Sequence, residues 1–162
     1  MEVSVLLTCV GSQVSPSVIE TLRNHPSHTV RVIGVDARNR DLAVGAQFTD
    51  RYFQVPMGME PGYVGAIEEI VRREEVKVIL PGSDEEALSL SKDRDRFSAR
   101  GCVVACSDYE ATRLAVDKFE LMTVLRASGV ATANLFSFAS LQELRERAEQ
   151  LGFPARPFVI KP

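Results

Sequence analysis

Short apolar runs and amphipathic stretches alternate along the first two thirds of the chain. Aliphatic and β-branched residues dominate the apolar runs, which is typical of strands; these runs cover residues 3–9, 30–36, 52–55, 76–80 and 102–106. Residues 17–24 and 63–75 between them carry apolar positions at helical spacing. Because the strands show no polar alternation, both faces of their sheet should be covered. The pattern therefore predicts an α/β fold, a Rossmann-like doubly wound parallel sheet.

The pattern changes after Cys106. Ser107–Glu110 is a predicted capping box that opens a short helix, and Ser140–Glu143 is a second one. We expect helices over residues 118–127 and 140–151, and strands over residues 133–138 and from 156 to 161. The predicted boundary between two domains lies near Ala115. Residues 1–115 would form the Rossmann-like domain, and residues 116–162 a truncated α+β segment, since the sequence stops within an apolar run.

Composition excludes several classes of protein. Hydrophobic residues make up 45% of the chain and charged residues 25%, as in ordinary globular proteins. The net charge of −3 and the lack of a basic stripe argue against a nucleic-acid binder. No apolar run approaches the roughly 20 residues of a membrane span, and the N-terminus lacks the basic start of a signal peptide. Three cysteines in apolar surroundings fit a reducing compartment, so we expect a cytoplasmic protein. No apolar stripe predicts an oligomeric state.

The turn after the first apolar run is the first candidate for ligand contacts, since open parallel sheets bind ligands at the carboxyl ends of their strands. Gly11 and Ser12 lie there and could offer a backbone and a hydroxyl donor to an acidic substrate. A plain tight turn is the alternative. The turn has one glycine where a dinucleotide fingerprint needs three, so Asp36 after the second run does not indicate a nicotinamide-dependent oxidoreductase.

A second candidate is the acidic turn Pro81–Glu86, which follows the fourth apolar run. Carboxylates at this position could hold the amine of an amino-acid-like substrate. Ser83 and Glu86 are better explained as a capping box, and acidic residues in a first helical turn complement the helix dipole. Asp84 and Glu85 stay open, and Glu85 is the stronger candidate for substrate binding.

Two lysines form the third candidate site. Lys118 begins a helix, where a positive charge opposes the dipole, so a nearby anion would explain its position. Lys161 ends an apolar run that should be buried, and a lysine in such a place often reaches solvent or a phosphate. His25 and His28 lie in an evident loop, and Cys102 and Cys106 have no nearby histidine. We therefore expect no metal ligands and no catalytic residues in this chain.

These segments together resemble the ATP-grasp superfamily, in the branch of the carbamoyl-phosphate-synthase large chain. Residues 1–115 look like its pre-ATP-grasp domain, and the resemblance extends over essentially the whole chain. The segments that carry it are Pro81–Glu86, Asp117–Lys118 with Gly129–Val130, and Gly152–Pro154 with Val159–Pro162.

The resemblance implies a function for a longer protein. In this family the lysines that match Lys118 and Lys161 contact ATP phosphates, and ATP with Mg²⁺ activates a carboxylate as an acyl phosphate that an amine attacks. The Mg²⁺ ligands of the family would lie beyond Pro162, so residues 1–162 alone should be inactive. The predicted function is thus the N-terminal fragment of a carboxylate–amine ligase with small-molecule substrates. The alternatives are a stand-alone Rossmann-type binding or regulatory module and, less favoured, a nucleotide-dependent oxidoreductase.

Overall fold

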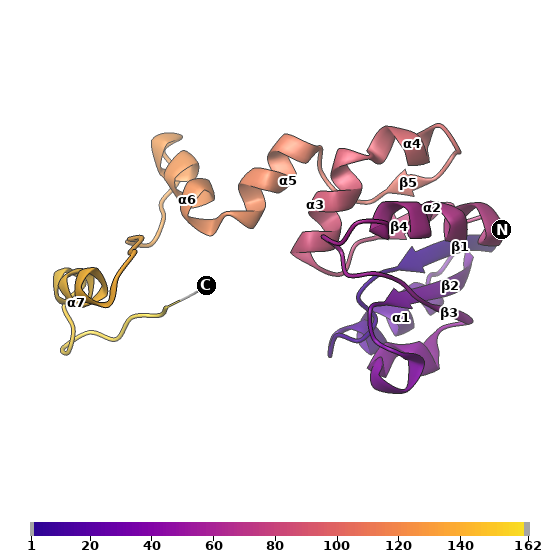
Figure 1. The fold of residues 1–162 in the computed structure, drawn as a ribbon, viewed down its shortest axis with the longest axis horizontal. Helices are drawn as coiled ribbons and strands as arrows, with labels where there is room; N and C mark the ends of the chain where they lie inside the picture. The colour runs from indigo at the N-terminus through magenta and orange to yellow at the C-terminus, as the bar shows by residue number, and fades with distance from the viewer. Residues whose placement is uncertain (1, 161–162) are drawn as a thin grey trace. The chain divides into compact units, whose positions relative to one another are not determined.

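The computed structural model describes residues 2–160 (Figure 1). The chain divides into two compact units, residues 1–113 and 114–162. The predicted assignment of residues 116–162 to a second domain stays a prediction.

The first unit alternates strands and helices. Its strands are β1 (Glu2–Leu7), β2 (Thr29–Asp36), β3 (Arg51–Gln54), β4 (Val78–Leu80) and β5 (Val103–Val104). Its helices are α1 (Ser15–Arg23), α2 (Tyr63–Glu74), α3 (Asp84–Lys92) and α4 (Arg94–Ser98), with two 3₁₀ turns, η1 (Arg40–Leu42) and η2 (Val44–Phe48). Helix α5 (Tyr109–Val116) begins in this unit and ends in the second.

All strand pairs are parallel, in the order β3-β2-β1-β4-β5. The predicted doubly wound parallel sheet is confirmed. Strand β1 lies in the centre, and the chain builds outward from it to β3 before crossing over to β4. The strand order therefore reverses between β1 and β4, and this is the point where open α/β sheets form their ligand crevice.

Alternating residues of the strands build one hydrophobic core on each face of the sheet. Leu6 and Ile79 point to the face covered by α2, α3 and α4, where Tyr63, Ile67 and Phe97 are fully buried. Leu7 and Val32 point to the opposite face, which α1 and η2 cover with Ile19 and Ala46. Burial on both faces explains why the strands read as continuous apolar runs.

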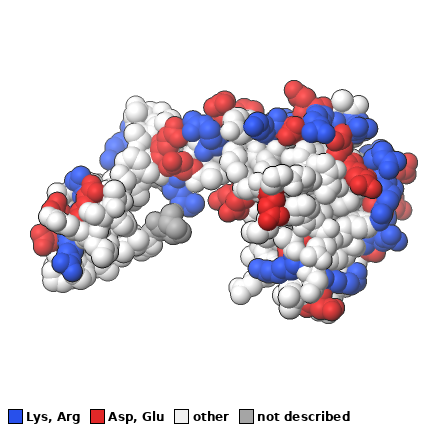
Figure 2. Space-filling model, in the orientation of Figure 1, with Lys and Arg blue, Asp and Glu red and all other residues white. Residues whose placement is uncertain are grey.

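Charged side chains of both signs interleave over the face of the first unit in Figure 2, without a continuous basic patch. No helix among the residues that the structure describes is long and apolar enough to cross a bilayer.

The helix starts in part follow the predicted caps. Ser83 accepts a hydrogen bond from the Glu86 amide at 3.3 Å, and Ser140 accepts one from the Glu143 amide at 3.1 Å. The prediction for Ser107 was wrong. Asp108 instead caps α5, because its Oδ1 accepts from the amide of Ala111 at 2.9 Å. The helix begins one residue later than the capping box required, and a carboxylate is as good an N-cap acceptor as a hydroxyl.

The second unit contains the end of α5 together with α6 (Lys118–Ala127) and α7 (Leu141–Gln150). Asp117 caps α6 by accepting from the amides of Phe119 at 3.0 Å and Glu120 at 2.9 Å. Residues 133–138 and 156–160 form no strand, contrary to prediction. A strand needs a hydrogen-bonded neighbour, and no strand of the described residues pairs with either segment.

The three cysteines are free thiols. Cys102 is fully buried, and this burial raises its pKa to about 11. Burial likewise raises the pKa of Cys9 and of Cys106, which are half-buried.

Candidate functional site

The carboxyl ends of β1 and β4 are joined through one threonine. The Thr8 amide donates to the Leu80 carbonyl at 3.1 Å, which continues the strand pairing by one residue. Its hydroxyl accepts from the Gly82 amide at 2.8 Å and donates to Glu86 Oε2 at 2.6 Å. Thr8 is 1% exposed. The turn after β4 is therefore fixed against the end of β1, at the point where the strand order reverses.

Gly82 permits this close approach. A Cβ at this position would collide with the Thr8 carbonyl oxygen and would lie 2.9 Å from the Cβ of Cys9. Any other residue would push the turn after β4 away from β1 and break the Thr8 hydrogen bond.

Glu86 is a buried carboxyl group at the crevice, with 6% of its surface exposed. Its Oε2 accepts from the hydroxyls of Thr8 and, at 3.2 Å, of Ser83. Burial raises the pKa of Glu86, while the two hydroxyl donors oppose this shift. The balance favours the neutral acid more than a carboxyl group in water does.

Tyr63, the first residue of α2, lies beside Thr8 and Glu86. Its hydroxyl is buried and forms no hydrogen bond of normal geometry within residues 2–160, although Glu86 and Thr8 are its neighbours. Burial, followed by the charge of Glu86, raises the pKa of Tyr63. An unsatisfied buried hydroxyl is rare in native proteins, and it occurs here beside a buried acid.

The side chain of Asp36, at the end of β2, binds the turn after β1. Its Oδ2 accepts from the Gly11 amide at 2.6 Å and its Oδ1 from the Arg38 amide at 2.9 Å. Arg38 Nη1 in turn donates to the Gly11 carbonyl at 2.9 Å. A Cβ at Gly11 would lie 2.7 Å from Asp36 Oδ2, so the glycine is required for this contact. The acid that would bind ribose in a dinucleotide-binding fold is thus engaged within the protein.

Cys9, in the turn after β1, has a strained backbone conformation. Its φ of 52° is in the left-handed region, which a non-glycine residue rarely adopts. Burial raises the pKa of Cys9, and the charges of Glu86 and Asp36 add to this effect. The thiol is therefore a poor nucleophile at neutral pH, and its position is more important than its reactivity.

The predicted substrate residues lie on the two turns of the crevice. Ser12 is half-buried, and Glu85 is exposed in the first turn of α3. Gly11 is buried, and its amide donates to Asp36. Lys118 is exposed at the start of α6, in the second unit. Lys161 lies outside the described residues.

Sequence reasoning assigned Glu86 a capping role only, and it did not select Thr8 or Tyr63. One signal for Glu86 was present. It lies four residues before Leu90, so it falls on the buried face of α3, where a carboxyl group needs partners. Thr8 and Tyr63 carry no such signal, because a threonine after a strand and a tyrosine opening a helix are both common.

No group of three or more histidine, cysteine, aspartate or glutamate residues in the described part of the chain could hold a metal ion. The segments that follow β1, β2 and β4 present a hydroxyl on Ser12, the guanidinium of Arg38 and an exposed carboxylate on Glu85. These groups can bind polar substrates through charge and hydrogen bonds.

Residues 5–105 match the family described as "PylC-like, N-terminal domain". No curated protein matches the chain.

Solved carboxylases share the fold. A single-chain, multi-domain long-chain acyl-CoA carboxylase has 17% identity and a TM-score of 0.58, with 91% of this chain and 14% of that protein covered. The biotin carboxylase subunit of pyruvate carboxylase has 15% identity and a TM-score of 0.58, with 95% and 34% covered. The biotin carboxylase domain of the Hydrogenobacter thermophilus 2-oxoglutarate carboxylase, in complex with MgADP, ADP and bicarbonate, has 16% identity and a TM-score of 0.58, with 93% and 33% covered.

The chain thus spans about a third or less of the length of these structures. The predicted resemblance is confirmed by the family match, which covers most of the first unit, and by the shared fold. The chain belongs to the PylC-like family through its N-terminal domain, in the carbamoyl-phosphate-synthase-like branch of the ATP-grasp superfamily.

Proposed function

We propose that this chain is the N-terminal part of an ATP-dependent ligase that joins a carboxylate to an amine through an acyl phosphate. The family match over residues 5–105 is the observation that carries the proposal. Residues 1–162 would supply the substrate side of the site and the first nucleotide contacts, and the remaining contacts would come from a longer protein. The three free thiols suit the reducing cytoplasm in which we expect it to act.

ATP and Mg²⁺ are the proposed cofactors of that longer protein. The 2-oxoglutarate carboxylase domain that shares the fold holds MgADP. In the present chain, Asp117 satisfies two amides at the start of α6, and the exposed Lys118 follows directly. A lysine at a helix N-terminus fits a phosphate group, because charge and dipole then act together on the anion. ATP would supply the phosphoryl group, and Lys118 and Lys161 would bind its phosphates. We assign no residue of residues 2–160 to Mg²⁺.

Substrate binding is proposed at the crevice between the turns after β1 and β4. Glu85 would accept hydrogen bonds from the ammonium group of an amine, since it is exposed on the first turn of α3. Ser12 would donate its hydroxyl to a carboxylate. Gly11 would shape the turn, since its amide is engaged by Asp36. The hydrogen bond between Thr8 and Glu86 would hold the two turns at a fixed separation. Ser12 and Glu85 would therefore keep a fixed distance from one another.

The test uses the longer protein and follows ADP release against a panel of amino acids and other carboxylates. We expect ADP release that depends on one carboxylate and one amine together. Lys118→Ala or Lys161→Ala should weaken ATP binding at least tenfold, whereas Lys92→Ala at the end of α3 serves as the surface-charge control. Substrate binding without any ADP release would instead support a binding module. Unchanged ATP affinity in both lysine variants would remove the nucleotide assignment.

A further inference from the structure

A pocket lies between edge strand β3 and helix α2, away from the turns after β1 and β4. Its volume is about 180 Å³, and its walls include Phe53, Val55, Ala66 and Ile70. Val55 and Ile70 also belong to the core beneath it, so the floor of the pocket is firmly packed. At about 30 Å³ per water molecule, the space equals about six waters, which suits a small metabolite.

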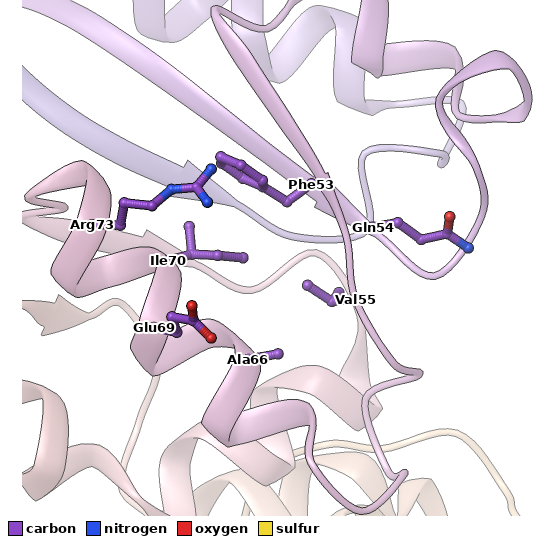
Figure 3. Close-up of a pocket in the computed structure, with 7 residues that line it drawn as sticks. All are labelled: Phe53, Gln54, Val55, Ala66, Glu69, Ile70 and Arg73. Atoms are coloured by element: carbon purple, nitrogen blue, oxygen red, sulfur yellow. The ribbon is translucent and has the colours of Figure 1, made fainter.

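Figure 3 shows that the polar groups of the pocket come mainly from one helix. Arg73 and Glu69 project from α2 beside Ile70 and Ala66, on the side that lines the pocket. Gln54 points away from them, and its amide group donates to the Ala37 carbonyl. The pocket therefore combines an apolar floor with one cation and one anion.

The two charges do not neutralise each other. Glu69 precedes Arg73 by four residues, a spacing at which such side chains normally pair. The guanidinium carbon of Arg73 instead lies 4.4 Å from the centre of the Phe53 ring. Its Nε donates a hydrogen bond to Glu74 Oε1 at 3.2 Å. Within residues 2–160, the terminal amino groups of Arg73 and the carboxylate of Glu69 have no hydrogen-bond or ion-pair partner. The terminal amino groups of Arg73 and the Glu69 carboxylate therefore remain available to a ligand, while Arg73 Nε stays bound to Glu74.

We propose that this pocket binds a free α-amino acid with an aliphatic side chain about the size of leucine. The ligand carboxylate would bind the terminal amino groups of Arg73, and its ammonium group would bind Glu69. Its side chain would cover Ile70, Val55 and Ala66. The separated charges and the apolar floor match the three parts of such a molecule, whereas a simple anion or cation would leave one charge unused. This inference is independent of the proposed ligase function, because the pocket lies at the edge of the sheet.

The test is a titration of the ¹⁵N-labelled chain with L-leucine, followed by NMR. We expect saturable shifts at the amides of Phe53, Val55, Ala66 and Ile70. Two analogues remove one charge each: 4-methylpentanoate lacks the ammonium group and 3-methylbutylamine lacks the carboxylate. Each should bind at least tenfold more weakly than leucine. Binding of leucine at the crevice would shift a separate set of amides, on the turns after β1 and β4.

Three variants locate the binding site. Glu69→Gln should weaken leucine binding at least tenfold while leaving 4-methylpentanoate unaffected. Ala66→Met should fill the pocket and abolish the shifts. Gly65→Ala is the matched control on the same helix, because a Cβ there meets nothing within 4 Å. The proposal is overturned if leucine gives no saturable shift at these amides, if 4-methylpentanoate binds as tightly as leucine, or if Glu69→Gln binds leucine as the unmodified chain does.

Discussion

The Thr8 hydroxyl uses both of its hydrogen-bonding capacities, and both partners are themselves fixed. It accepts from the Gly82 amide and donates to Glu86, whose carboxyl group is buried. This hydroxyl links the end of β1 to the turn after β4 more firmly than a packing contact would. Removing it leaves the Gly82 amide and the Glu86 carboxyl group each without a hydrogen-bond partner.

Replacing Thr8 tests this link. Thr8→Val keeps the shape but removes the hydroxyl, so the Gly82 amide and Glu86 each lose a partner. We expect the free energy of unfolding to fall by about 1–3 kcal/mol in urea denaturation. Thr8→Ser retains the hydroxyl and should recover most of this loss. Equal stabilities of the valine and serine variants would show that the hydroxyl contributes little.

Glu86 gives the chain a pH dependence of a defined sign. Its folded pKa is raised by burial, so its contribution to stability is complete below its unfolded pKa of about 4.3 and is lost as the pH rises through its folded pKa. Glu86→Gln cannot ionise. We therefore expect the stability of the unmodified chain, measured relative to this variant, to decrease from pH 4 to pH 8 in urea denaturation.

Glu85→Gln removes the same charge from the exposed neighbouring position and controls for the change in net charge. A difference between Glu86→Gln and the unmodified chain that stays constant across this pH range would show that Glu86 does not titrate as its burial requires.

The sequence indicated which turns lie at the ligand-binding edge of the sheet. It did not identify the residues that join these turns to one another. Short apolar runs without polar alternation indicated a parallel sheet, so the turns after the first and fourth runs could be predicted at its ligand-binding edge. The hydrogen bond from Thr8 to Glu86 joins residues that are 78 positions apart. It depends on how two helices and two strands are placed relative to one another, which no local sequence pattern indicates. Gly11 illustrates the same limit, since its amide binds Asp36 rather than solvent.

Helix α6 depends on its N-cap residue, Asp117, more than on packing. None of its residues is buried, so the two hydrogen bonds accepted by Asp117 form a large part of its support. Short helices without buried faces are marginal on their own. The capping residue and the lysine proposed to bind phosphate are thus adjacent, and the cap fixes the direction in which the lysine leaves the backbone.

Asp117→Ala should destabilise this helix by about 0.5–2 kcal/mol. The corresponding result is faster amide hydrogen exchange at Leu121 to Ala127, by roughly 2- to 30-fold. Asp117→Asn keeps a side-chain acceptor and should retain most of the protection. Equal exchange rates in the alanine variant and the unmodified chain would contradict the capping role.

After residue 106, elements that form their own hydrogen bonds were predicted well, and those that need a distant partner were not. The helices after residue 106 follow from caps and spacing, which are local. Residues 133–138 and 156–160 have strand-like composition but no neighbouring strand in the described residues. Strand propensity reflects fit to a sheet surface, so without that surface it predicts little.

At the scale of the whole molecule, both hydrophobic cores of the sheet lie within the first unit. The residues of both clusters all lie between Leu6 and Cys106 in the sequence. The first unit therefore has what a domain needs to fold alone.

A chain ending at Val116, the last residue of α5, tests this independence. We expect it to unfold cooperatively, with a urea midpoint close to that of the complete chain when both are followed by a probe in the sheet. A loss of cooperative unfolding would show that residues 117–162 stabilise the sheet. Removal of residues 102–116, which include β5 and α5, is the destabilising comparison.

The three thiols have a practical consequence for labelling chemistry. Maleimides and disulfide reagents react with thiolates, and burial keeps all three native thiols protonated beyond neutral pH. A single cysteine introduced on an exposed helix position should therefore react well ahead of Cys9, Cys102 and Cys106. Fluorophores or spin labels could then report on either unit of the chain without first replacing the native cysteines.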